Sequence, residues 1–367
     1  MSRPLRAAMK PPTPTVVFDS YWTFATRRQE IFHQRVEGAP PPWTDDPVLR
    51  EFRFTNAYRA ADRVSQYLIR HVAYQGDQSA EEVVFRVLLF KLFNRISTWE
   101  LLESEIGEIT AAGFDVERYD SVMTKAIGNG QRLYSAAYIM PPASRGGGRK
   151  HSSHLQLIQA MLEDRLPDQL LGSASMADAF GLLLGLRGVG TFLAYQLVTD
   201  INYTAALDYS EMEFVMAGPG ARSGIEKCFS DLGDYSVEDV IRWTADRQLD
   251  EVRKRGLDFM DLWGRPLQLI DCQNLFCEVD KYARVVHPEV ASRAGRTRIK
   301  QRFQADPSPL EVWFPPKWGL NEHVPDAPFV PATTELGRSE RFSPSSAHAS
   351  CGQAELFCSE PDTSALS

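Results

Sequence analysis

Residues Leu182 to Phe214, LLLGLRGVGTFLAYQLVTDINYTAALDYSEMEF, predict two helices joined by a glycine turn. Gly188 and Gly190 are one residue apart and allow a tight turn, so we expect a hairpin over residues 182–201 whose second helix starts at Thr191. The first N–H groups of a helix have no partner within the helix, so this end can bind a phosphate. The alternative is a plain turn between helices, with Gly188 or Gly190 as a C-cap.

An acidic cluster follows the second helix. Asp208 lies 18 residues after Gly190, and Glu211 and Glu213 are close to it. This arrangement resembles DNA glycosylases of the helix-hairpin-helix type, in which a loop after the hairpin carries the catalytic aspartate. The resemblance implies that the three carboxylates are candidate catalytic residues. It also implies that Gly188, Gly190 and Thr191 contact DNA phosphate without reading sequence. Lyase-competent members carry a Schiff-base lysine where this chain has Phe192, so a lyase mechanism is not expected.

Four further blocks carry a resemblance to one family: residues 42–69, 88–102, 217–229 and 269–288. With the hairpin, they resemble the helical-domain family of 5-hydroxymethyluracil DNA kinases and alpha-glutamyl/putrescinyl thymine pyrophosphorylases. That glycosylase-like group is associated with thymine hypermodification in phage DNA and has cellular relatives. The resemblance covers residues 18–324 and implies a mainly α-helical, glycosylase-like body.

Composition is typical of an intracellular globular protein, which we expect to be nuclear in a eukaryotic source. The chain has 43% hydrophobic residues in 367, enough for a large core, and no apolar run of the length that spans a membrane. The basic, proline-broken start excludes a secretory signal. Five cysteines without a CxxC pair predict reduced thiols. We expect a disordered lead at 1–17 and a disordered tail at 325–367, where small polar residues show no apolar period.

The net charge of −8 does not favour general binding to nucleic acid. The tail holds two arginines and six acidic residues and so supplies four of these charges. Any contact with DNA should therefore use a local basic patch. Arg59, with the neighbouring Asn56, is one candidate, and a second is the basic run from Arg293 to Arg302, for which a solvated face is the alternative.

The front half of the chain predicts mostly helices. Apolar residues recur at spacings of three and four from Phe54 to Leu68 and predict one amphipathic helix. Ser79 and Glu82 form a potential capping box before VVFRVLLFKLF, which we expect at the centre of the core. The glycine-rich basic segment 141–153 predicts a loop, and it lacks the spacing of a phosphate-binding P-loop.

A second candidate anion site is AGPGARSGIEKCF, residues 217–229. Gly218, Gly220 and Ala221 lead into a predicted helix whose capping box would be Ser223 and Glu226. The alternative is a rigid turn that only starts a helix. In the family resemblance this block belongs to the pattern, which favours the anion-binding interpretation.

The helix predicted from Leu269 to Val286 places Asp271, Asn274 and Glu278 on one face. By itself this pattern is typical of an amphipathic helix with solvated charges. Because the block resembles the family, Asn274, Glu278 and Lys281 are also candidate site residues. Trp43 and Trp318 could stack on an extruded base, although burial in the core is the expectation for any single aromatic residue.

The resemblance implies an enzyme acting on 5-hydroxymethyluracil in DNA. The hydroxymethyl group would be phosphorylated and, in pyrophosphorylase-type members, displaced by an amine. That transfer needs a base, for which Asp208 or Glu213 are candidates, and donors that stabilise the departing pyrophosphate. The candidate donors are the helix after Gly220, Lys281 and Arg284, with Mg²⁺ as a candidate cofactor and no metal-ligand motif.

Two alternatives remain. The body could bind modified or distorted DNA without chemistry, or it could assist a separate DNA kinase, since the chain shows no P-loop or protein-kinase motif set. DNA is the expected partner in each case, and no membrane is expected.

Overall fold

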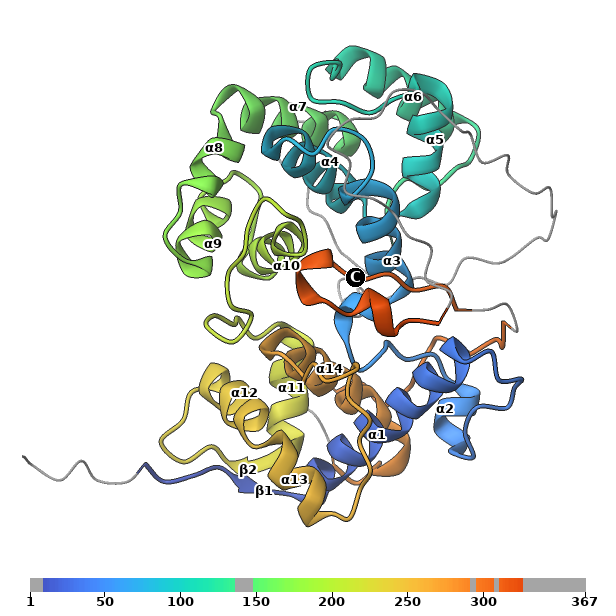
Figure 1. Cartoon of the computed structure of the whole chain (residues 1–367), viewed down its shortest axis with the longest axis vertical. Helices are drawn as coiled ribbons and strands as arrows, with labels where there is room; N and C mark the ends of the chain where they lie inside the picture. The colour runs from blue at the N-terminus through green and yellow to red at the C-terminus, as the bar shows by residue number, and fades with distance from the viewer. Residues whose placement is uncertain (1–8, 136–147, 291–294, 307–309, 326–367) are drawn as a thin grey trace, which may run out of the picture.

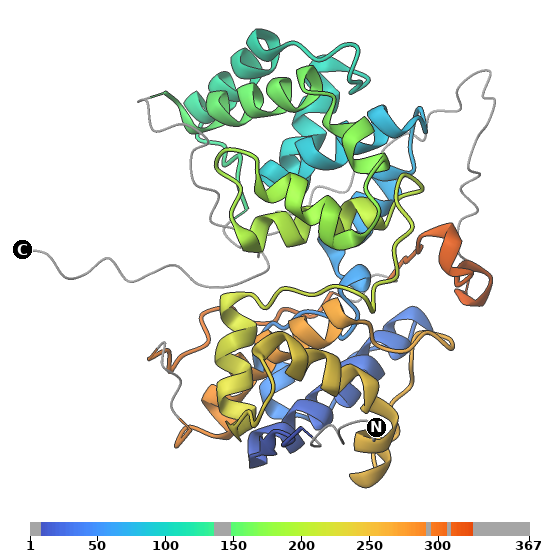
Figure 2. The ribbon, with the colours of Figure 1, turned by 90° about the vertical axis from the view of Figure 1, so that its left-hand side faces the viewer.

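The computed structural model describes residues 9–135, 148–290, 295–306 and 310–325. It is mainly α-helical, as predicted, and its helices form two lobes that are seen one above the other in Figure 2. In Figure 1 the first lobe lies above and contains the helices of the middle of the chain, whereas the second combines the start of the described chain with its later helices, and residues 310–325 lie between the lobes. The first lobe comprises α3 (Arg63–Tyr67), the π-helix η2 (Leu68–Ala73), α4 (Ala80–Phe93), α5 (Ile96–Ile106), α6 (Val116–Gly128), α7 (Lys150–Glu163), α8 (Leu166–Leu171), α9 (Met176–Leu184) and α10 (Thr191–Asn202). The second comprises β1 (Thr13–Pro14), α1 (Val16–Val36), α2 (Pro47–Glu51), α11 (Pro219–Cys228), β2 (Phe229–Asp231), α12 (Val237–Asp246), α13 (Gln248–Lys254) and α14 (Leu269–Val286).

Helix α4 is the centre of the first lobe, as its apolar sequence predicted. Every residue from Val83 to Phe93 is buried, and α7, α8 and α10 pack around it. The predicted capping box is wrong: the side chain of Ser79 makes no capping bond, and Glu82 accepts hydrogen bonds from the backbone N–H of Ala111. Glu82 therefore ties α4 to the loop after α5.

The amphipathic helix predicted over residues 54–68 is also wrong. The chain there forms a short 3₁₀ turn, η1 (Arg59–Ala61), followed by α3 and η2. Asp62 accepts a hydrogen bond from the backbone of Asn56, and the side chain of Asn56 donates to the carbonyl of Ala61. These bonds hold a turn in place of a helix, and this segment joins the two lobes.

Helix α14 is the centre of the second lobe and has the predicted bounds. Helices α1, α11 and α12 pack against it, and Asp271, Asn274 and Glu278 are each less than 5% exposed. The predicted solvated face is therefore wrong, because the lobe covers this helix on nearly all sides. Each of these polar groups consequently needs a partner inside the protein.

The expected lead contributes to the second lobe, since β1 pairs with β2 in antiparallel fashion just before α1. Cys228, Cys272 and Cys277 are buried free thiols, as predicted. The expected tail from residue 326 on, Cys351 and Cys358 within it, and most of the predicted glycine-rich loop lie outside the described residues. No helix within the described ranges is long and apolar enough to cross a membrane.

Gly224 sets how closely α11 approaches α14. A Cβ atom at this position would lie 1.9 Å from the carbonyl oxygen of Phe276. We predict that Gly224→Ala lowers the free energy of unfolding by about 3 kcal/mol, because two packed helices must separate. Urea unfolding followed by circular dichroism measures this.

Gly181 supplies the control, because it lies inside α9 and a Cβ there would meet nothing within 4 Å. Gly181→Ala should leave stability unchanged or raise it by up to about 1 kcal/mol. Equal stability of the two variants would show that the α11–α14 crossing is not tight.

Candidate functional site

The glycine hairpin has the predicted geometry. Helices α9 and α10 pack against each other, Gly188 has a φ of +84° that favours glycine, and Gly190 is the N-cap of α10. The turn is exposed, as are Gly190 and Thr191, whereas Val189 anchors it in the core. A Cβ at Gly190 would face open space. A phosphate can therefore approach the N–H groups at this end of α10.

The second glycine turn lies beside the hairpin. Gly218 is the N-cap of α11 and packs so closely against the ring of Phe192 that a Cβ there would lie 3.1 Å from it. Two predicted anion sites, the N-termini of α10 and α11, are thus neighbours. The predicted capping box at Ser223 is wrong, because α11 already begins at Pro219 and the Ser223 hydroxyl donates to Asp280. Ala221 is fully buried under this turn.

Arg59 lies at the centre of a buried ionic network between the lobes. Its guanidinium group makes two hydrogen bonds to the Asp200 carboxylate, at 2.7 and 2.9 Å, and its Nε donates to Gln196 at 3.1 Å. Lys91 of α4 contacts the same carboxylate at 3.0 Å. Burial opposes the charge on Asp200, but Arg59 and Lys91 outweigh it and lower the pKa of this carboxyl group. Burial also lowers the pKa of Lys91, to about 8.

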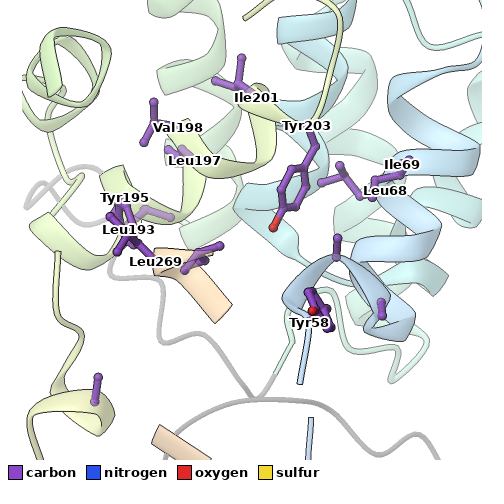
Figure 3. Close-up of a cluster of buried hydrophobic side chains, with 14 of the residues drawn as sticks. Tyr58, Leu68, Ile69, Leu193, Tyr195, Leu197, Val198, Ile201, Tyr203 and Leu269 are labelled. Carbon is purple, nitrogen blue, oxygen red and sulfur yellow. The ribbon is translucent and has the colours of Figure 1, made fainter. Parts of the chain in front are cut away.

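We call these four residues, Arg59, Asp200, Lys91 and Gln196, the Arg59 clamp. In Figure 3 the side chain of Tyr203, at the end of α10, points toward the segment that carries Tyr58. The guanidinium of Arg59 also lies 5.4 Å from the centre of the Tyr203 ring. Since Arg59 and Asn56 are buried, the geometry does not favour the phosphate contacts expected of them.

Four charged residues and one tryptophan gather near the clamp. We call this group the Glu211 cluster; it contains Glu211, Arg265, Lys317, Trp318 and Asp208. Glu211 pairs with Arg265 at 2.6 Å, and the Arg265 guanidinium lies 3.8 Å from the centre of the Trp318 ring. Lys317 lies 3.4 Å from Asp208. Burial raises the pKa of Glu211 although Arg265 opposes this effect, and burial lowers the pKa of Lys317.

The acidic residues of this cluster differ in burial. The side chain of Glu211 is 8% exposed and that of Asp208 is 85% exposed. Glu213 is exposed, and only its backbone carbonyl contacts Arg242. A carboxylate in a partly dry site is a stronger candidate for a general base than a solvated one. The geometry therefore favours Glu211 over Asp208 and Glu213.

The candidates on α14 do not join this cluster. Glu278 pairs with Lys281 at 2.8 Å and accepts a hydrogen bond from the backbone of Thr55. Asn274 is buried and accepts a bond from Gln273, and Arg284 pairs with Asp280 at 2.6 Å. These side chains hold the second lobe together and lie apart from Glu211.

Arg265 and Lys317 were missed by sequence reasoning. Arg265 lies in the loop between α13 and α14, and Lys317 lies in the 3₁₀ turn η3 (Pro316–Trp318), which η4 (Asn321–His323) follows. Neither belongs to a recognisable motif. The only signal was Trp318, which the sequence suggested as a base-stacking residue. In the described part of the chain no group of three or more His, Cys, Asp or Glu side chains is arranged to hold a metal ion.

Asp271 connects α14 to the clamp. Its carboxylate accepts hydrogen bonds from the backbone N–H groups of Arg59, at 2.7 Å, and Gln268, at 3.0 Å. Burial raises its pKa to about 7, although these two bonds oppose the shift. The clamp thus joins α10, the second hairpin helix, to α4 and to the segment bound by α14, and the Glu211 cluster lies at the C-terminal end of α10.

Comparison with known proteins places this architecture in a family. A family model described as the 5-hmdU DNA kinase, helical domain, matches residues 15–292, and the chain belongs to this family. A relative from Bacillus phage SP10, a 5-hmdU DNA kinase, is 27% identical over 300 residues. The match covers 76% of this chain and 46% of the relative, so the chain spans less than half the length of that protein. No solved structure matches the chain.

The raised pKa of Asp271 predicts a pH-dependent stability. An unfolded aspartate releases its proton near pH 4, whereas Asp271 holds its proton up to about pH 7 in the folded protein. As the pH rises between these values, the unfolded chain ionises first and folding loses up to about 4 kcal/mol. Asp271→Asn cannot titrate and should escape this loss.

We therefore predict that the stability deficit of Asp271→Asn is smaller at pH 8 than at pH 5 in urea unfolding. Glu213→Gln, which removes an exposed carboxylate, is the control for a general effect of charge. A deficit for Asp271→Asn that does not change with pH would show that this carboxyl group is ionised throughout the range.

Proposed function

We propose that this chain acts on 5-hydroxymethyluracil in DNA, with the hairpin on the phosphate backbone and the Glu211 cluster at the base. The observation that carries the proposal is the position of the cluster. A carboxylate, two cations and a tryptophan meet at the C-terminal end of α10, the second hairpin helix, where Lys317 donates to the carbonyl of Thr204 and Trp318 packs on Tyr203. Membership of the family indicates which nucleobase is the substrate, because the phage relative is named for this modified nucleoside.

The reaction we propose is transfer of an amine to the phosphorylated hydroxymethyl carbon. A C–N bond forms at that carbon while the C–O bond to the phosphate or pyrophosphate breaks, and its electron pair leaves with the oxygen. Glu211 takes the proton of the amine, and burial raises its pKa, which makes it a stronger proton acceptor than a solvated carboxylate. Arg265 and Lys317 stabilise the departing anion.

The acidic net charge of the chain agrees with a DNA contact that is limited to the hairpin. Binding that relied on a broad basic surface would need many phosphate contacts, whereas a helix N-terminus binds phosphate through N–H groups and adds no charge. The two cations of the Arg59 clamp are buried and paired with Asp200, so they do not contribute to a basic surface. The proposed contact with DNA is therefore narrow and centred on the hairpin.

A second candidate function is an accessory role for a kinase that phosphorylates the same base. It is favoured by the extent of the match, because the relative named as a kinase contains more than twice the length matched here. In that case the chain would bind 5-hydroxymethyluracil DNA and present it, and the Glu211 cluster would contact the base without reacting.

The two functions are separated by product analysis with matched carboxylate variants. The protein is incubated with 5-hydroxymethyluracil DNA or its phosphorylated form and with candidate amines, and the digested nucleosides are measured by mass spectrometry. We predict that Glu211→Gln lowers product formation by roughly 10² or more while affinity for DNA is kept. Glu213→Gln, the exposed control, should retain activity.

Gly190→Val should instead weaken the affinity for DNA, because a side chain in the open space before α10 would block a phosphate. It should weaken binding of modified and unmodified DNA by the same factor. Product formed equally by Glu211→Gln and the unchanged protein would remove Glu211 as the base. Absence of a new nucleoside under every condition, with DNA binding intact, would favour the accessory role.

A further inference from the structure

The second lobe contains a cavity that the proposed reaction does not use. It has a volume of about 250 Å³ and lies between α1, the loop before α2, α2 itself, and residues 303–305. Arg28, Arg35 and Arg50 line it, and no aspartate or glutamate does. Three arginines thus gather at one cavity in a chain whose net charge is −8, although Asp62 and Glu278 lie close enough to Arg28, and Asp306 to Arg35, to interact with them.

Two of these arginines have buried donors without an acceptor. Within the described residues, the Nη1 atom of Arg28 and the Nε atom of Arg35 are inaccessible to solvent and make no hydrogen bond. In the described part of the chain, the Nη2 atom of Arg35 makes only a long hydrogen bond, 3.5 Å to the carbonyl oxygen of Asp306. Burial lowers the pKa of Arg28 to about 10 and also lowers that of Arg35. A buried donor without an acceptor is costly, and an anion bound by these guanidinium groups would reduce that cost if the side chains turned toward it.

The remaining wall of the cavity is aromatic. Trp43, Phe52, Phe54 and Phe303 line it, and Phe303 meets the Trp43 ring edge to face with centroids 6.4 Å apart. Trp43 is held in place by a hydrogen bond from its Nε1 to the carbonyl of Ala39 and by the guanidinium of Arg35, 5.0 Å from its ring centre. Fixed aromatic faces of this kind stack on planar bases.

We propose that this cavity binds a nucleotide, with the base against Trp43 and the phenylalanines and the phosphate on Arg28, Arg35 and Arg50. Guanidinium groups suit phosphate because they donate paired, parallel hydrogen bonds. The volume lies just below the usual range of small-molecule sites, which favours one base with one phosphate over a triphosphate. The ligand is either a free nucleoside monophosphate or a nucleotide turned out of a DNA strand.

This proposal stands apart from the Glu211 cluster, since none of that cluster's residues lines the cavity. Its test is calorimetric titration of the full chain with thymidine monophosphate, adenosine monophosphate, thymidine and inorganic phosphate, each to millimolar concentration. A short single-stranded oligonucleotide is titrated as well. Binding by a monophosphate assigns a free ligand, whereas oligonucleotide binding that the monophosphates do not show, and that Arg28→Gln and Arg35→Gln weaken, assigns a strand nucleotide.

Arg35→Gln and Arg28→Gln should each weaken nucleotide binding about tenfold or more, the effect expected for a lost charge-assisted hydrogen bond. Arg50→Gln, on the exposed side of α2, tests the same contact if a more buried variant fails to fold. Arg253→Gln, an exposed arginine on α13, is the control and should bind as the unchanged protein does.

Trp43→Leu should weaken binding of the nucleotide and leave any affinity for inorganic phosphate unchanged. The proposal is overturned if no nucleotide or oligonucleotide binds, if phosphate alone binds as tightly as the nucleotide, or if the folded arginine variants bind as tightly as Arg253→Gln. Loss of nucleotide binding in these variants with continued turnover of DNA would separate this site from the proposed reaction.

Discussion

The ion pair of Arg59 with Asp200 is the contact on which the junction between the lobes depends. Both side chains are at most 2% exposed, and charges so far from water are stable only if each is fully partnered. The Asp200 carboxylate forms ion pairs with Arg59 and Lys91, and the Arg59 side chain also donates a hydrogen bond to Gln196. Because Arg59 belongs to the segment between the lobes and Asp200 belongs to α10, the pair fixes where the hairpin sits relative to α14.

The segment around Arg59 also links the other features of the molecule. Phe54 lines the cavity, and the backbone of Thr55 donates to Glu278. The backbone of Asn56 donates to Asp62, whose pKa burial raises to about 7. The short segment from Phe54 to Asp62 thus lines the cavity, bonds to α14 and contributes Arg59 to the clamp. The hydrogen bonds of Asn56 to Asp62 and Ala61 hold a turn here, while the apolar residues of the segment stay buried, which explains why a helical pattern in the sequence folds as a turn.

The sequence predicted the elements whose pattern was strong. The glycine turn at Gly188 and Gly190, the buried α4 and the bounds of α14 were all predicted, since each rests on local periodicity or backbone freedom. Burial of polar groups was not. Asp271 and Glu278 have the spacing of a solvated face, and only the packing of α1, α11 and α12 around α14 hides them.

The candidate site was predicted in part, for the same reason. Proximity to the hairpin indicated the acidic cluster, but which carboxylate is shielded depends on Arg265 and Trp318, residues that lie more than 50 positions away in the chain. Arg28 and Arg35 gave no signal at all, because they lie on a long helix among other charged residues. Only the approach of residues 303–305 turns them into the wall of a cavity.

The central claim is that the Arg59–Asp200 pair couples the lobes, and a double-mutant cycle tests it most directly. The free energies of unfolding are measured for the unchanged protein, Arg59→Met, Asp200→Leu and the double variant. The account predicts a coupling energy of about 2 kcal/mol or more, because Arg59→Met leaves Asp200 with Lys91 but without Arg59, Asp200→Leu leaves the buried guanidinium of Arg59 without its carboxylate, and the double change removes both of these charges. A coupling below about 0.5 kcal/mol, the level of independent sites, would contradict it.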